Sequence, residues 1–226
     1  KRIHVVEQKA NLYENVWQTF LQSQQDDSED VGTIPHRDKA VLIVPCDAPL
    51  ITPQEVEHFI SHADMDRYDH VLGLVSREKL RHFYPQASKP GIKMAYLHIQ
   101  DDSFRINNLH LVKPLRIENR EYIQKMYQYR YQRNFKNLVL FGLSVFGKDK
   151  AKHYKNYIGL QLCLFFGGLG LEFVVDYFRK LNPKKELEES ISTIMRTRFS
   201  ALEVPFPGAA LDIDNAKDYE AMKTRF

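Results

Sequence analysis

The sequence has few of the residues that mark several common classes of protein. Its two cysteines, Cys46 and Cys163, form neither a disulfide framework nor a metal-type spacing, which fits a reducing compartment. Its first residues do not have the pattern of a secretory signal. The longest apolar run, residues 158–171, is shorter than the ~20 residues that a membrane span requires. We therefore expect a cytoplasmic protein without a transmembrane segment.

Neither an excess of charge nor a phosphate-binding glycine motif is present. With 32 basic and 29 acidic side chains, the net charge of +3 suits phosphorylated ligands without requiring nucleic acid. Residues 120–155 are basic and rich in tyrosine, but Ile123, Met126 and Tyr127 follow helical spacing, so we expect a helix here and no nucleic-acid partner. No GxG-type or GxxxxGK motif precedes the first predicted strand, and the glycine cluster at 167–170 lies too late in the chain to replace one.

The most informative stretch is residues 39–60. Residues 40–44 are an unbroken apolar run typical of a central strand that is covered on both faces. A helix then begins at Thr52, with Pro53 in its first turn and Glu55 placed to complete a capping box. Asp47 lies between them, at the carboxyl end of the strand, where open α/β sheets bind ligands. Its carboxylate either holds a divalent cation such as Mg²⁺ or hydrogen-bonds the backbone of the turn.

Hydrophobic patterning predicts strands and helices along most of the chain. We expect strands at 3–6, 68–75, 93–99, 104–112 and 201–204, and helices at 11–21, 53–62, 76–83 and 186–199. Residues 100–103 are predicted to be a hairpin loop. The histidines at 58, 62, 70 and 82 match no zinc spacing, so we expect them at the surface or in ordinary packing. Strands that alternate with helices indicate the α/β class.

Two separated motifs carry a resemblance to a known family. The stretch VLIVPCDAPLITPQEVE at 41–57 resembles a signature of the GT-A-type nucleotidyltransferases, which include molybdenum-cofactor guanylyltransferase. The stretch LDIDNAKDYE at 211–220 resembles the closing Asp-x-Asp motif and last helix of that family. The resemblance implies one three-layer α/β/α domain over residues 1–226, with a mainly parallel sheet and a helical insertion at 116–182. It also implies a first βα unit with a glycine-rich loop, which we expect to be missing from this numbering.

The resemblance implies transfer of a nucleoside monophosphate from a nucleoside triphosphate to a phosphorylated acceptor, with release of pyrophosphate. Asp47 and Asp214 would hold the Mg²⁺ ion. Residues that the resemblance would place on the acceptor are Lys93, Arg105, Asn107, Asn108, Arg133 and Lys136. The alternative for the first four is a solvent-facing hairpin with an asparagine pair in a strand bend.

The sequence also allows two other functions, and it allows two other roles for its most apolar segment. The chain could be a GT-A glycosyltransferase that binds metal through Asp212 and Asp214, or a nucleotide-binding regulatory module without activity. The apolar segment 158–178, rich in phenylalanine, is expected to pack in the core. It could instead form a homodimer contact or rest on a membrane surface.

Overall fold

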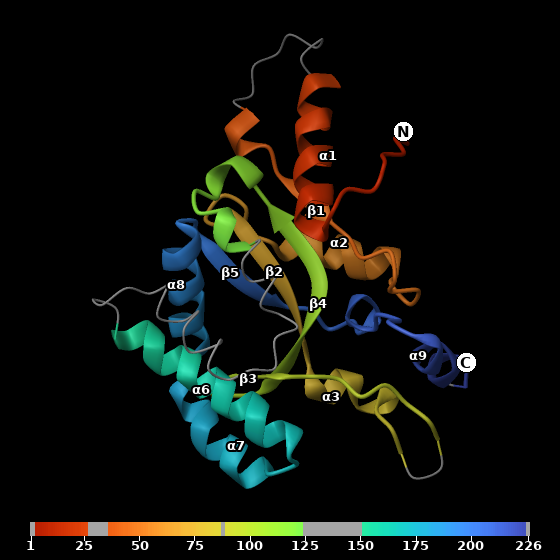
Figure 1. Cartoon of the computed structure of the whole chain (residues 1–226), viewed down its shortest axis with the longest axis vertical. Helices are drawn as coiled ribbons and strands as arrows, with labels where there is room; N and C mark the ends of the chain where they lie inside the picture. The colour runs from red at the N-terminus through yellow and green to blue at the C-terminus, as the bar shows by residue number, and fades with distance from the viewer. Residues whose placement is uncertain (1–2, 27–35, 87–88, 124–150, 225–226) are drawn as a thin grey trace.

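The computed structural model describes residues 3–26, 36–86, 89–123 and 151–224. Its described strands form one sheet in the order β1-β4-β2-β5, with β3 beside β4 (Figure 1). The strands are β1 (Val41–Ile43), β2 (His70–Ser76), β3 (Leu97–His98), β4 (Ser103–Val112) and β5 (Phe199–Glu203). β2 and β5 pair in parallel, whereas β4 is antiparallel to β1, β2 and β3.

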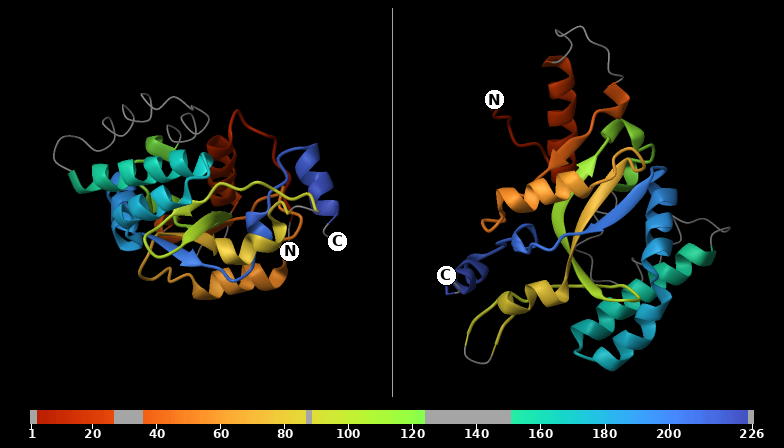
Figure 2. Two further views of the ribbon diagram at one scale, coloured as in Figure 1. Left: turned by 90° about the horizontal axis from the view of Figure 1, so that it is seen from below. Right: turned by 180° about the vertical axis from the view of Figure 1, so that it is seen from behind.

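Helices cover both faces of this sheet, as the views from below and from behind show (Figure 2). The described helices are α1 (Leu12–Asp26), α2 (Pro53–His62), α3 (Arg77–Leu80), α6 (Ala151–Gly168), α7 (Glu172–Phe178), α8 (Lys184–Met195) and α9 (Ala216–Lys223). α2 and α9 lie on one side of the sheet, and α6 and α8 lie on the other. The predicted α/β class with helices on both sides is confirmed.

The direction of the strands follows the prediction, but the position of the first one does not. β1, β2, β3 and β5 run the same way, and β4 runs against them. Since β4 lies between β1 and β2, β1 is an edge strand of the described sheet and its residues are only half-buried. The expectation that residues 40–44 form a central strand covered on both faces is therefore wrong for the described residues.

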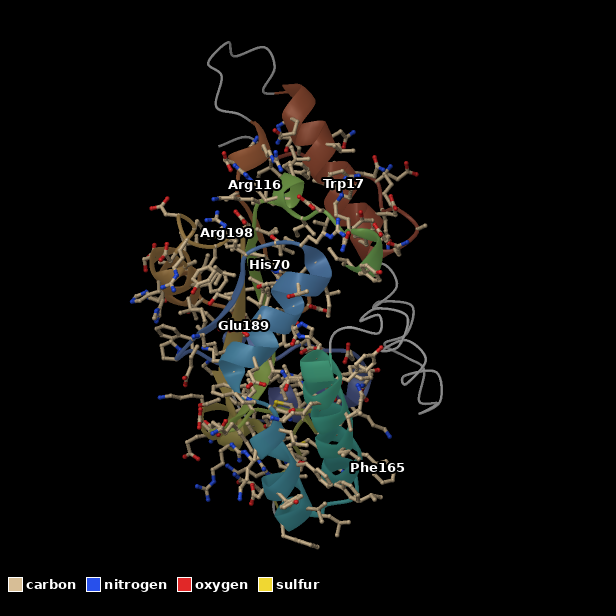
Figure 3. The ribbon with its side chains drawn as sticks, turned by 90° about the vertical axis from the view of Figure 1, so that its left-hand side faces the viewer. Trp17, His70, Arg116, Phe165, Glu189 and Arg198 are labelled. Atoms are coloured by element: carbon tan, nitrogen blue, oxygen red, sulfur yellow. The ribbon has the colours of Figure 1, made fainter. Side chains whose placement is uncertain are left out.

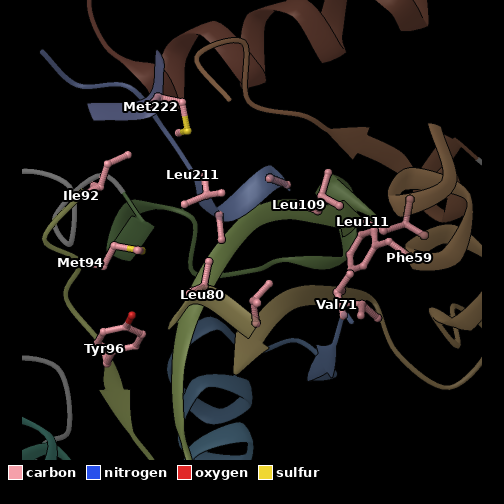
Figure 4. Packing of buried hydrophobic residues seen from close by; sticks show 14 of the residues in the cluster. Phe59, Val71, Leu80, Ile92, Met94, Tyr96, Leu109, Leu111, Leu211 and Met222 are labelled. Carbon is pink, nitrogen blue, oxygen red and sulfur yellow. The ribbon is translucent and has the colours of Figure 1, made fainter. Parts of the chain in front are cut away.

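Alternation along β2 divides its side chains between two cores. Val71 and Val75 point to the α2 side, where they join the largest buried cluster, which also contains Phe59 (Figure 4). Leu72 and Leu74 point to the α8 side and pack with Phe199 and other residues of a second cluster. A strand with both faces apolar is what a sheet between two helical layers requires.

Several predicted elements have other bounds in the structure, and the strand expected at 93–99 is only the two-residue β3. Residues 3–6 are not a strand; Ile3 and Val5 are 91% and 94% exposed, because no described strand pairs with this segment. α8 ends at Met195, earlier than expected, because Arg196 takes a left-handed conformation with φ of 46°. Phe199, predicted on the helix, is instead the first residue of β5 and is buried.

α6 and α7 form a helical hairpin with one buried and one exposed face. Cys163 on α6 and Val175 on α7 are almost fully buried, and the rings of Phe166 and Phe178 stack at 5.8 Å. The opposite face is apolar and open to solvent: Ile158, Leu164, Phe165, Leu169, Phe173 and Tyr177. Phe165 projects from the outer side of α6 (Figure 3). The expected burial of this segment is correct for the inner face and wrong for the outer face.

Among the described residues, we find no helix that combines the length and the apolar character needed to cross a bilayer.

Two histidines on the α8 side of the sheet face each other. His70 Nε2 and His110 Nδ1 lie 3.1 Å apart, and the ring of Phe199 meets that of His70 edge-on. Burial lowers the pKa of His70 to about 3, helped by the charge of His110, and it lowers the pKa of His110 to about 4. Both rings are therefore neutral in the folded protein at neutral pH.

We expect the free energy of unfolding to fall as the pH drops from about 6.5 towards 4. In this range the unfolded chain protonates both imidazoles and the folded chain does not, so protons favour unfolding. One unit of pKa difference is worth ~1.4 kcal/mol, so the loss is on the order of several kcal/mol. Urea unfolding between pH 7 and 4 measures it. The double variant His70→Leu/His110→Leu should flatten the pH dependence, and His82→Leu, at an exposed position, should not. Equal slopes in all three proteins would contradict this account.

Candidate active site

The two motifs that are far apart in the sequence meet in the structure. The backbone N–H of Ile213 donates a hydrogen bond of 3.0 Å to the carbonyl oxygen of Asp47. This bond joins the loop after β1 to the segment that leads into α9, one residue before Asp214. The side chains of Asp47 and Asp214 are both exposed to solvent. The loop after β1 and the segment before α9 are thus in direct contact, and each carries one of the two aspartates.

Glu55 links the start of α2 to the same region. Thr52 Oγ1 caps α2 by accepting from the backbone N–H of Glu55 at 3.2 Å, as the capping box predicts. Glu55 Oε1 also accepts from the backbone N–H of Ala209 at 3.0 Å. The side chain is 1% exposed. Burial raises the pKa of the Glu55 carboxyl, and the backbone N–H groups of Ala209, Gly208 and Thr52 oppose the rise. Glu55 therefore fastens the helix to the loop that carries Asp214.

Arg105 holds this loop from β4. Its Nε donates to the carbonyl oxygen of Ala210 at 2.7 Å, and its Nη2 forms an ion pair with Asp212. Both charged side chains are less than one fifth exposed. Asn108 adds a hydrogen bond of 3.3 Å from Nδ2 to the carbonyl oxygen of Ala209. Asp212 is thus engaged by Arg105, and Asp214 is the aspartate of this motif that faces solvent.

The predicted acceptor-binding residues differ in their exposure and in their contacts. Lys93 is exposed, between Ile92 and Met94, which are buried in the core of the α2 side. Arg105 touches the loop of the second motif, as described above. Arg133 and Lys136 lie outside the described residues.

Asn107 and Asn108 form a bend in β4. Asn107 is fully buried, and its Oδ1 accepts from the backbone N–H of Leu109 at 3.1 Å. Asn108 has a positive φ of 58°, and the register between β2 and β4 shifts at this point. A Cβ atom added to Gly73, opposite on β2, would lie 1.9 Å from Asn107 Oδ1. The asparagine pair thus shapes a strand bend, as the alternative states, but Asn107 is buried and does not face solvent.

The donor set fits a hard divalent cation. Mg²⁺ usually binds one or two carboxylates of the protein, with waters and substrate phosphates completing its octahedral shell. Asp47 and Asp214 supply two exposed carboxylates, which is enough for such a site. Within the described parts of the chain, no group of three or more histidine, cysteine or acidic side chains is arranged to hold a metal by itself. A cation at this site would therefore depend on the phosphates of a bound nucleotide.

The anchoring contacts could not be found from the sequence. Glu55 was identified as a helix cap, but its bond to Ala209 joins residues 154 positions apart. Arg105 was expected to bind the acceptor, and its pairing with Asp212 spans 107 positions. The charges of Glu55 and Arg105 were the only features of the sequence that could have indicated these contacts. Arg77, which follows the carboxyl end of β2 directly, was also not identified from the sequence.

No protein-family model and no curated protein matches the sequence. Among solved structures, the fold is similar to that of a protein described as a hypothetical transferase from Thermus thermophilus, with a TM-score of 0.61. The two chains are 19% identical, and the match covers 93% of this chain and 70% of the other. At this identity the similarity concerns the fold alone. The chain therefore resembles that protein in its overall fold.

Proposed function

We propose that the chain is a Mg²⁺-dependent nucleotidyltransferase that transfers a nucleoside monophosphate to a small phosphorylated acceptor. The observation that carries this proposal is the hydrogen bond between Ile213 and Asp47, which brings both family-like motifs to one place. The similarity in fold to a hypothetical transferase supports transfer chemistry in general. The nucleotidyl step rests on the resemblance of the two motifs.

The reaction balances without a nucleophile from the protein. An oxygen of the acceptor phosphate forms a bond to the α-phosphorus of the nucleoside triphosphate. The bond from that phosphorus to the oxygen that bridges it to the β-phosphorus breaks, and pyrophosphate leaves with the electron pair. A phosphate monoester has its second pKa near 6, so its oxygen needs no general base at neutral pH. The protein contributes positioning and charge neutralisation.

Each described residue of the site has a defined task in this scheme. Asp47 and Asp214 would hold Mg²⁺, which supplies neutralisation of the charge on the phosphates and on the leaving pyrophosphate. Glu55 and Arg105 are positioning residues, because they hold the loop before Asp214 through hydrogen bonds to Ala209 and Ala210.

Pyrophosphate release tests the proposal. We expect the chain to release pyrophosphate when one of the four nucleoside triphosphates is combined with an acceptor from a panel of sugar and polyol phosphates, and to stop when EDTA removes Mg²⁺. Release that continues under chelation would contradict the metal role. Transfer from a nucleotide-sugar would favour a glycosyltransferase instead, and nucleotide binding without turnover of any substrate would favour a regulatory module.

A further inference from the structure

A cavity of about 320 Å³ lies at the start of α3, directly after β2. It is lined by Arg77, Glu78, Arg81, Tyr84, Tyr96 and Asp102. Ligand pockets usually span ~300–1,000 Å³, so this cavity is at the small end of the range. It has room for a small organic molecule or for one part of a larger one. Both signs of charge and two aromatic rings line it, which suits a polar, charged ligand.

The cavity opens at the same edge of the sheet as Asp47. Arg77 is the first residue after β2, and Asp47 follows β1, which runs in the same direction as β2. Asp102 directly precedes β4, whose Phe104 pairs with Ser76 at the end of β2. Although β4 lies between them, β1 and β2 both lead to the carboxyl edge of the sheet, where ligands of α/β proteins bind.

Side-chain contacts join the cavity to the aspartate motif. The guanidinium carbon of Arg77 lies 5.5 Å from the centre of the Tyr96 ring. On β4, Arg105 pairs in register with Val75 of β2, two residues before Arg77. Arg105 in turn pairs with Asp212. Arg105 therefore lies next to the end of β2, which leads into the cavity, and it also contacts the loop that presents Asp214.

The two arginines of the cavity form ion pairs with exposed carboxylates. They are four positions apart, and Arg81 continues the helical backbone of α3 with φ of −54° and ψ of −36°, so both face the same side. Arg77 pairs with Glu172 of α7 at 3.2 Å, and Arg81 pairs with Glu78 at 4.0 Å. All four side chains are substantially exposed. Exposed ion pairs contribute little to the free energy of folding, so an anionic ligand can replace either carboxylate.

We propose that this cavity binds the far end of the acceptor, the end opposite its reacting phosphate. Arg77 and Arg81 bind an anionic group there, and Glu78 and Asp102 accept hydrogen bonds from hydroxyl groups. The acceptor class is accordingly a small sugar or polyol with an anionic group at each end. Glu172 occupies Arg77 while the acceptor is absent. This assignment rests on the proposed nucleotidyltransferase function for the identity of the ligand as an acceptor.

The two members of the Arg77–Glu172 pair are expected to have opposite effects on ligand binding. Arg77→Gln removes a charged donor and should weaken binding of the probe glucose 1,6-bisphosphate at least about tenfold. Glu172→Gln removes the competing carboxylate and should tighten binding about two- to fivefold. Calorimetric titration of the whole chain, without nucleotide, measures both dissociation constants. Arg67→Gln is the matched control, because Arg67 lies over the ring of Tyr68 at 5.4 Å in the loop before β2, at the other end of that strand.

A structural role for the pair predicts a different pattern. If Arg77 and Glu172 only tie α7 to the sheet, both substitutions will lower the melting temperature alike and leave probe binding unchanged, and the assignment is overturned. Failure of the probe to bind the parent at millimolar concentration also overturns it. Probe binding with the expected opposite shifts, in a chain that releases no pyrophosphate, supports the cavity and rejects the proposed function. Pyrophosphate release with parental acceptor KM in Arg77→Gln rejects the cavity and keeps the function.

Discussion

Asp47→Asn is expected to lower kcat for pyrophosphate release about 100-fold or more and to leave the protein folded. The substitution keeps the size of the side chain and removes the charge that attracts a divalent cation. A bound metal contributes several kcal/mol of transition-state stabilisation, and each 1.4 kcal/mol corresponds to about tenfold in rate. Because the Asp47 side chain is exposed, the free energy of unfolding should change by less than about 0.5 kcal/mol. The expected loss is therefore in rate and not in stability.

A matched variant separates this effect from a general loss of surface charge. Asp64 is also exposed, and its Oδ1 accepts from the backbone N–H of Arg67 at 3.0 Å, a bond that asparagine can keep. Asp64→Asn should have parental kcat. Steady-state kinetics of pyrophosphate release, with urea unfolding of the same samples, gives both quantities. An Asp47→Asn protein that is as active as the parent would remove the metal role of this residue.

Gly208→Ala is expected to destabilise the protein by about 3 kcal/mol, the upper end of the usual range for overpacking. A Cβ atom at this position would lie 2.3 Å from the carbonyl oxygen of Leu50 and 2.5 Å from Glu55 Oε2. The first neighbour is backbone and the second is a buried carboxylate bound to the next residue, Ala209, so neither can move away at low cost. The loop would have to shift, and Asp214 would shift with it. We therefore expect loss of stability and loss of activity together.

Gly168→Ala is the control for this substitution. Gly168 is the last residue of α6, it is exposed, and no atom lies within 4 Å of the Cβ that alanine would add. Alanine in a helix is favoured over glycine by roughly 0.5–1 kcal/mol, so this variant should be neutral or slightly stabilised. Urea unfolding midpoints of both variants test the comparison. Equal stability of Gly208→Ala and the parent would show that the loop is not packed as described.

Local patterns in the sequence predicted the start of α2 and the position of β4. Thr52, Pro53 and Glu55 mark the start of α2, and the predicted capping contact is present. The alternation in 104–112 predicted β4, and the loop before it is the predicted hairpin turn. Such signals depend on neighbours within about four residues, which is why they can be read without a structure.

These local patterns do not predict contacts between residues that are far apart in the sequence. The edge position of β1 depends on β4, which lies about 60 residues later and inserts between β1 and β2. The exposure of Phe165 and Phe173 depends on which face of the α6–α7 hairpin meets the sheet, and apolar content alone does not show this. The metal role of Asp47 and Asp214 came from family resemblance, and it stays a prediction. Only their adjacency is a finding of the structure.

Anomalous scattering from Mn²⁺, in crystals of the chain grown with Mn²⁺ and a non-hydrolysable nucleoside triphosphate, tests the central claim most directly. Mn²⁺ accepts the same oxygen ligands as Mg²⁺. We predict one strong anomalous peak within about 2.0–2.3 Å of carboxylate oxygens of both Asp47 and Asp214, in contact with the nucleotide phosphates. A nucleotide bound with its metal elsewhere, or with no metal peak at these two aspartates, would contradict the account.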